Sequence, residues 1–185
     1  MGGGHKIVNQ EHMHFITPTV VGWLDIFSRK VYRDIIIDSL KYCQQNKGLV
    51  VHAYVIMRKH LHLVVSAKEG YILSDIIRDF KKFTAKAIIK HNNTHNIESR
   101  REWMMQIFKY HAKYNKRNTN YQLWTNYNHP TEVYSQRFIG QKINYIHQNP
   151  VKAGFVDRAE DWIYSSARNY LGMKGIIDIE IIEFH

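Results

Sequence analysis

Residues 49–65 contain two short apolar runs joined by a basic turn at Arg58 and Lys59, a pattern that predicts a β-hairpin. Successive side chains of a strand point to opposite faces of the sheet, so residues two apart share a face. His60 and His62 in the second run are therefore expected side by side. The apolar residues of that run share the other face: Leu61, Leu63 and Val65. One face of this strand is therefore apolar and the other carries the histidines. The fold has to provide a different environment for each face.

Two neutral imidazoles at this spacing provide half of a divalent-metal site. The alternative is a pair of ordinary, partly buried strand histidines, and the chain contains 12 histidines. The His-x-His pattern alone does not decide between these interpretations, so the rest of the chain has to.

The segments around the hairpin predict further elements. Residues 15–26 are rich in β-branched and aromatic side chains, which favours a first strand. Apolar residues recur at helical spacing over residues 29–46 and again over 74–90. Ser28 and Ser74 precede these stretches and are predicted to be their N-caps.

The second half of the chain predicts shorter elements. Residues 99–102 have the Ser-x-x-Glu form of a capping box, which indicates a following helix. Residues 121–125 predict the last strand, in which Trp124 either packs in the core or stacks on an exposed base. A helix capped by Ser135 is expected to end near Asn149, because Pro150 disfavours helical geometry in the residue before it.

The order strand, helix, strand, strand, helix, strand is that of a ferredoxin-like split βαβ fold. We therefore expect an α+β protein with an antiparallel sheet and additional helices, one of them near the C-terminus. Two helices would cover one face of the sheet and leave the other open, with His60 and His62 on the open side. The length predicts a single domain over residues 1–185, with a core at about 14–170 and a tail, 171–185, without an assigned role.

The charge of the chain favours a polyanionic partner. Lys and Arg number 26 against 16 Asp and Glu, which gives a net charge of +10. Nucleic acid or an anionic membrane surface would satisfy such a charge. Positive charge is concentrated in the predicted helix 74–90, where every charged residue from Phe80 onward is basic. That face either follows a phosphate backbone or is simply solvated.

Other features of the composition bear on location. With Cys43 as the one cysteine, no disulfide within the chain is possible, which fits a reducing compartment. No apolar run approaches the roughly 20 residues that cross a bilayer. The first residues lack the apolar stretch of a signal peptide. We therefore expect a cytoplasmic protein that does not insert into a membrane.

The helix that ends at Pro150 contains a second chemical pair. Tyr145 and Asn149 are four residues apart and therefore share a helix face. A tyrosine and an amide placed together can act as nucleophile and metal ligand, although most of the 12 tyrosines are expected to pack or to form hydrogen bonds.

Several stretches of the sequence, taken together in their order along the chain, resemble the single-tyrosine transposases of the HUH endonuclease superfamily. The resemblance is closer to the REP-associated tyrosine transposases. The resemblance extends from the first strand to Tyr170. It rests on Tyr54-Val55-Ile56-Met57, His60-Leu61-His62-Leu63, Leu123-Trp124, residues 145–154 (Tyr-Ile-His-Gln-Asn-Pro-Val-Lys-Ala-Gly) and Tyr164-Ser165-Ser166-Ala167.

The resemblance implies roles for particular residues. His60 and His62 would bind a divalent metal, Mg²⁺ or Mn²⁺, and Tyr145 would be the nucleophile. The third ligand would be Asn149, where the insertion-sequence branch usually has glutamine. Because asparagine is one methylene shorter, Gln148 or a bridging water is an alternative source of the oxygen.

The resemblance also implies an activity. The protein would be an endonuclease and strand transferase that cuts single-stranded DNA beside a hairpin and forms a covalent phosphotyrosine. The alternative is a non-catalytic protein that binds hairpin DNA or RNA. The sequence leaves open whether the protein acts as a homodimer. The candidate contacts to the DNA backbone are Arg58, Lys59, Arg78, Lys81, Lys82 and Lys86.

Overall fold

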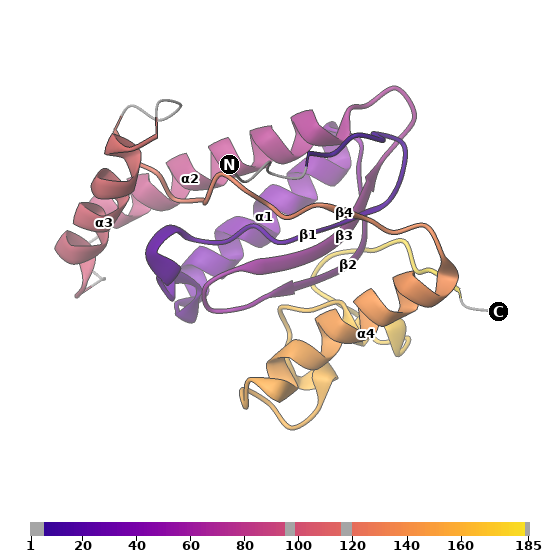
Figure 1. Cartoon of the computed structure of the whole chain (residues 1–185). Coiled ribbons are helices and arrows are strands. Elements are labelled where there is room, and N and C mark those ends of the chain that lie inside the picture. The colour runs from indigo at the N-terminus through magenta and orange to yellow at the C-terminus, as the bar shows by residue number, and fades with distance from the viewer. Residues whose placement is uncertain (1–5, 95–98, 116–119, 184–185) are drawn as a thin grey trace.

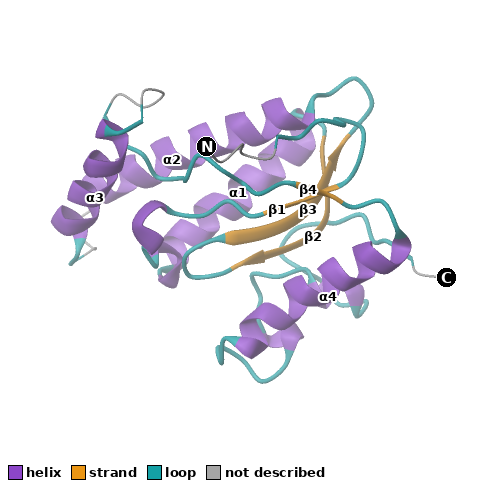
Figure 2. Cartoon of the chain, in the orientation of Figure 1, coloured by secondary structure: helices purple, strands orange, loops and turns teal. Residues whose placement is uncertain are grey.

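The computed structural model describes residues 6–94, 99–115 and 120–183, and within them a four-stranded antiparallel sheet (Figures 1 and 2). The strand order is β2-β3-β1-β4, the order of a ferredoxin-like fold. The predicted α+β class and antiparallel sheet are therefore confirmed. The strands are β1 (His14–Ile16), β2 (Leu49–Ile56), β3 (Leu61–Ala67) and β4 (Thr131–Glu132).

Helices lie on both faces of this sheet. Figure 1 shows α1 and α2 on one side of it and α4 on the other, with α3 beside the far end of α2. No helix in the described ranges is both long and apolar enough to cross a membrane. The α-helices are α1 (Lys30–Asn46), α2 (Leu73–Thr94), α3 (Arg101–Lys113), α4 (Gln136–Lys152) and α5 (Ala167–Tyr170).

The larger core lies between the sheet and helices α1 and α2. The odd-numbered residues of β3 are fully buried there, as the alternation predicts: Leu61, Leu63 and Val65. They pack with residues such as Ile36 of α1 and Phe80 of α2. Burial of a large aliphatic side chain is worth about 1.5–3 kcal/mol, so this layer contributes much of the stability.

The opposite face of the sheet is not open, and that expectation was wrong. Helix α4 packs on β2 and β3, where Ile139, Ile143 and Ile146 cover a second cluster that includes Phe15 and Val64. The reason lies in α4 itself. Its apolar residues recur at helical spacing, and a helix with such a face must bury it against another element. With α1 and α2 filling the other side, the exposed sheet face is the surface that remains.

The first strand is shorter than predicted. Instead of one strand over residues 15–26, β1 ends at Ile16, and two short 3₁₀ turns follow at Val21–Trp23 and Ile26–Ser28. Pro18 has no N–H to donate to a ladder, and Gly22 adopts a left-handed φ of 63°. Both residues break the run of strand geometry.

The last strand lies later in the chain than predicted. Residues 121–125 make only an isolated bridge, between Trp124 and Val20, whereas β4 forms at Thr131–Glu132, beyond the segment predicted as the last strand. The apolar side chains of the earlier segment enter the core without a ladder. Trp124 is 5% exposed and donates from Nε1 to Thr84 Oγ1 over 3.0 Å. It is therefore a core residue and has no exposed face for a base.

The predicted caps are partly correct. Ser135 caps α4 by accepting a hydrogen bond from Phe138 N over 3.2 Å. At the other helices the N-cap falls elsewhere. Arg29 and Arg100 precede α1 and α3 without a side-chain cap bond, and Ser74 lies inside α2. Ser28 Oγ instead donates to Asp25 O within the preceding 3₁₀ turn.

Helix α4 continues through Pro150 to Lys152, beyond its predicted end near Asn149. Proline in the last turn removes only one N–H donor, and the next bond persists because Ala153 N donates to Asn149 O over 3.0 Å. The buried Pro150 ring adds packing that offsets the missing bond.

Gly48 lies in the turn between α1 and β2 with a φ of +69°, and a Cβ there would lie 2.4 Å from Tyr71 Cδ2. We expect Gly48→Ala to lower the free energy of unfolding by about 2–4 kcal/mol, because left-handed strain adds to a clash with a ring.

Gly70 is the matched control, since its φ is +82° but no atom of the described residues lies within 4 Å of its Cβ position. Gly70→Ala should cost only about 1 kcal/mol of strain. Urea unfolding of both variants measures the difference, and equal decreases in stability would contradict the clash.

Candidate active site

The hairpin turn brings the two histidines together. Met57 N donates to His60 O over 2.9 Å, which closes the turn, and His62 then pairs with Val55 inside the sheet. The ring centres of His60 and His62 are 4.6 Å apart. The shared face predicted from strand alternation is therefore formed, although His60 pairs with Thr19 by an isolated bridge and precedes β3 itself.

Each histidine presents an unused nitrogen. His60 Nδ1 and His62 Nε2 are buried and have no hydrogen-bond partner among the described residues. Buried polar atoms are nearly always paired, so these two unpartnered nitrogens are candidate ligand atoms. Burial lowers the pKa of His62 to about 3, with a smaller contribution from His60, and burial also holds the pKa of His60 below its usual value. Both rings are therefore neutral at pH 7, the state that binds a metal.

Two residues of the first strand and the turn after it orient His62. Thr17 Oγ1 lies 3.0 Å from His62 Nδ1, and the Phe15 ring stacks on the imidazole at 5.4 Å. When Nδ1 carries the proton and donates it to Thr17, the lone pair of Nε2 is free. A hydrogen bond on the second ring nitrogen is the usual device for orienting a histidine ligand.

Helix α4 brings Tyr145 to the same place. The Tyr145 ring meets the His62 ring edge-on at 5.2 Å and lies 6.1 Å from the Phe15 ring. The Tyr145 side chain is 42% exposed, whereas His62 is 5% exposed. The tyrosine is therefore reachable from solvent while it rests against the histidine pair.

A buried serine fixes α4 relative to the sheet. Ser166 Oγ accepts from Tyr54 N of β2 over 3.0 Å and lies 2.8 Å from His147 Nε2 of α4. The main chain at Ser166 also donates to Tyr54 O over 3.0 Å. The segment before α5 thus lies along the edge of β2 and connects that strand to the helix that carries Tyr145.

Asn149 lies one turn after Tyr145, as the spacing predicts. Its Nδ2 donates to the carbonyl oxygen of Tyr145 over 2.9 Å, which turns the amide back along the helix. Gln148 is half-buried beside it. The described ranges hold no cluster of three His, Cys, Asp or Glu side chains. A third protein ligand would therefore have to be of another residue type, and the amides of Asn149 and Gln148 are the candidates that the sequence predicts.

The candidate DNA-binding residues are not equivalent. Lys82, Lys86, Arg58 and Lys59 are exposed, the first two on α2 and the other two at the hairpin turn. Lys81 is different: its ammonium donates to Thr125 O and Asn128 Oδ1, both at 2.8 Å. Burial lowers the pKa of Lys81 to about 8. This lysine holds the loop before β4 to helix α2.

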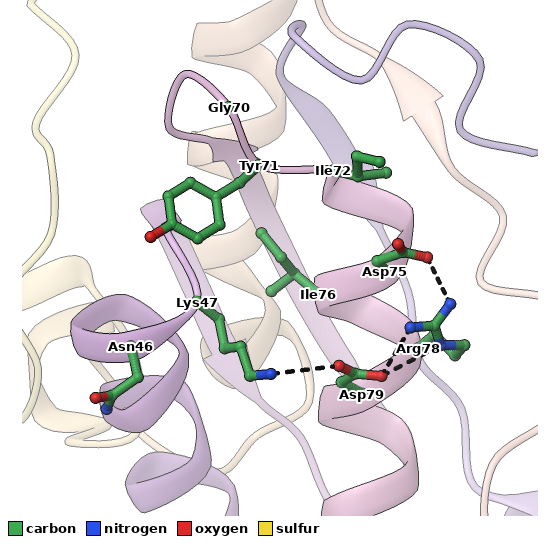
Figure 3. A pocket seen from close by; sticks show the side chains of 9 residues that line it. All are labelled: Asn46, Lys47, Gly70, Tyr71, Ile72, Asp75, Ile76, Arg78 and Asp79. Carbon is green, nitrogen blue, oxygen red and sulfur yellow. Dashed lines mark hydrogen bonds and ion pairs between the residues drawn. The ribbon is translucent and has the colours of Figure 1, made fainter.

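Arg78 borders a cavity of about 420 Å³ between the end of α1 and the start of α2 (Figure 3). Its guanidinium binds Asp75 at 2.5 Å and Asp79 at 3.0 Å, and Asp79 also pairs with Lys47 at 3.6 Å. The charges around this cavity therefore neutralise one another. The cavity also lies in the layer of α1 and α2, which cover the sheet face opposite α4. We assign no chemistry to this cavity.

Three residues of the site escaped the sequence analysis. Thr17 and Phe15 reach His62 only through the pairing of β1 with β3, which aligns Ile16 with Leu63, and no local pattern reports that register. The third is Lys142, whose ammonium lies 6.0 Å from the centre of the Tyr145 ring. It could have been found from the sequence, because it lies three residues before Tyr145 and therefore on the same helix face.

We expect Thr17→Val to weaken Mn²⁺ binding roughly 10- to 100-fold, the usual effect of removing a hydrogen bond that orients a histidine ligand. Isothermal titration calorimetry with Mn²⁺ measures the affinity. Thr17→Ser keeps the hydroxyl and should bind nearly as the wild type does. Equal Mn²⁺ affinities for the valine and serine variants would contradict the role given to Thr17.

Comparison with known proteins places the chain in a family. The family model for IS200-like transposases matches residues 8–127, which include both histidines. A REP-associated tyrosine transposase bound to a REP hairpin superposes with a TM-score of 0.66 at 16% identity, over 100% of this chain and 95% of the other. That likeness shows the shared fold.

A protein of Deinococcus radiodurans R1 described as a transposase gives a TM-score of 0.44 at 20% identity, over 79% of this chain and 95% of the other. No curated protein matches the chain. Because the matched family model spans more than half of the sequence, the chain belongs to the IS200-like transposases.

Proposed function

We propose that this transposase cuts and rejoins single-stranded DNA through a covalent bond between Tyr145 and a DNA 5′ phosphate. The observation that carries the proposal is the contact between the exposed Tyr145 and His62, which belongs to a histidine pair with two buried, unpartnered nitrogens. A phenol alone is a poor nucleophile at neutral pH, since free tyrosine has a pKa of about 10. The reaction therefore needs charge stabilisation and close control of where the phosphate lies.

His60 and His62, with Asn149 or Gln148, would hold Mg²⁺ or Mn²⁺, which supplies positive charge to polarise the scissile phosphate. The donor set of two imidazoles and an amide suits these ions with water and phosphate oxygens in the remaining positions. The lowered pKa values of both histidines support this assignment, because protons would not compete for the nitrogens at neutral pH.

In the proposed step, Tyr145 Oη forms a bond to phosphorus while the bond from phosphorus to the 3′ oxygen breaks. The phenol proton passes to solvent, and the leaving oxygen takes up a proton to become a 3′ hydroxyl. A second 3′ hydroxyl can then attack the phosphotyrosine, which re-forms a phosphodiester and restores the phenol. Cleavage and joining balance without an external energy source.

We propose hairpin-containing DNA as the substrate. The structural relative with a TM-score of 0.66 is bound to a REP hairpin, and the +10 charge of this chain supports a nucleic-acid partner. Helix α2 and the Tyr145 site lie on opposite layers of the fold. Lys82 and Lys86 would therefore contact a different segment of the DNA from the one that is cut, and Arg58 and Lys59 lie on the turn next to His60.

Tyr145→Phe should abolish cleavage, because phenylalanine cannot attack phosphorus, while hairpin binding persists. The assay incubates the protein with single-stranded hairpins and Mn²⁺ and maps the adduct by mass spectrometry. A nucleotide-bearing peptide that contains Tyr145 is expected. An adduct on Tyr127 or Tyr164, or cleavage without any adduct, would refute the assignment.

Metal dependence is tested in the same assay. Replacing both His60 and His62 with alanine should remove cleavage, and Asn149→Ala should reduce it less. Full activity of the histidine double variant, or of the wild type in chelator, would show that no metal is needed. Hairpin binding without any cleavage under all conditions would favour a non-catalytic hairpin-binding protein.

The lysines of α2 should separate into two groups. Removing one lysine that binds a DNA phosphate reduces the slope of log affinity against log salt by about 0.7–0.9. We expect this reduction for Lys82→Gln and Lys86→Gln with unchanged thermal stability. Lys81→Met should instead lower the melting temperature, because its ammonium binds two oxygens of the loop before β4. Salt titrations and thermal melts distinguish the groups, and an unchanged slope in both glutamine variants would exclude this face.

A further inference from the structure

Lys142 lies on α4 one helical turn before Tyr145, and its ammonium lies near three aromatic rings. Its ammonium is 4.5 Å from the ring centre of Phe15, 5.2 Å from that of Phe138 and 6.0 Å from that of Tyr145. Phe15 in turn stacks on His62. The positive charge thus lies near the proposed nucleophile and against the Phe15 ring, which in turn stacks on His62.

The ammonium of Lys142 has aromatic partners and no acidic one among the described residues. Among the described residues, no carboxylate lies within ion-pair distance of it. Lys30 and Arg78, by contrast, bind carboxylates of their own helices. Lys142 is half-buried, and its charge is felt at His62, whose pKa it helps to lower.

A lysine stem normally carries its ammonium out to bulk water. Here the stem instead packs beside rings that attract a cation without neutralising it. A positive charge held in this way, next to neutral imidazoles, is suited to an anion that arrives with the substrate. The backbone phosphate that Tyr145 would attack is such an anion.

We propose that Lys142 is a catalytic residue that binds the scissile phosphate and stabilises its charge as Tyr145 attacks. This inference rests on the proposed function of Tyr145 and adds a residue to it. The ammonium acts as a fixed charge, and its proton is not transferred. Charge placed in advance where it develops in a transition state is among the largest contributions to catalysis.

The test compares Lys142→Met with Lys142→Arg. Methionine keeps the apolar stem against Phe15 and Phe138, and arginine keeps the charge. At saturating hairpin DNA with Mn²⁺, we expect Lys142→Met to slow formation of the Tyr145 adduct roughly 100- to 1,000-fold, as for removal of a preorganised donor. DNA affinity should fall by much less, and Lys142→Arg should recover most of the rate. Lys41→Met, on α1 in the opposite layer, is the matched control and should keep the wild-type rate.

A second measurement does not require cleavage. In the Tyr145→Phe background, binding of a single-stranded oligonucleotide is titrated against salt. Adding Lys142→Met should reduce the slope of log affinity against log salt by about 0.7, the value for one phosphate contact on a single strand. Thermal melts of each variant ensure that folded proteins are compared.

The outcomes separate the two proposals. An unchanged salt slope, or an unchanged adduct rate in Lys142→Met, overturns the role of Lys142. A slow Lys142→Arg with a normal melting temperature does so as well, because charge is then not what matters. If the wild type forms no Tyr145 adduct but the slope depends on Lys142, the function of Tyr145 fails and the phosphate site stands.

Discussion

The alternation of side chains along β3 is the constraint on which both layers of this protein depend. Leu61, Leu63 and Val65 are buried under α1 and α2, while His62 and Val64 face α4. A slip of one residue in the pairing would exchange these sets and place an imidazole in the larger core. The same slip would remove Leu61, Leu63 and Val65 from that core, and the loss of this apolar burial enforces the register. The same pairing that stabilises the fold therefore holds the histidine pair toward the tyrosine helix.

The position of Tyr145 depends on a second set of contacts. Apolar residues of α4 pack on the sheet, and the hydrogen bonds around Ser166 join α4 to β2 through His147 and Tyr54. These bonds are buried, so breaking one leaves an unsatisfied group at a cost of about 1–3 kcal/mol. The proposed nucleophile is thereby held on a helix that packs against a strand whose register is also fixed. Such rigidity suits a reaction in which the phosphate has to be placed by the protein.

Several features could be predicted from the sequence because they depend on neighbours in the chain. The hairpin at Arg58 and Lys59 and the cap at Ser135 both follow from local patterns, and both are present. The fourth strand could not be predicted in this way. Thr131–Glu132 is short and polar, and it becomes a strand only because the edge of β1 offers it partners. Residues 121–125 have stronger strand propensity but are used as core packing.

The sequence by itself determined the chemistry available to this protein: two histidines on one face of a strand, and a tyrosine and an asparagine on one face of a helix. Periodicity in strands and helices is a local property, so these pairs could be recognised without a structure. Only the tertiary structure decided that the pairs meet, because the contact joins residues distant in the chain, His62 and Tyr145. It also decided that α4 covers the histidine face, that Thr17 orients His62 and that Lys81 is held inside the fold. Those facts follow from packing and register between distant segments, which no local pattern records.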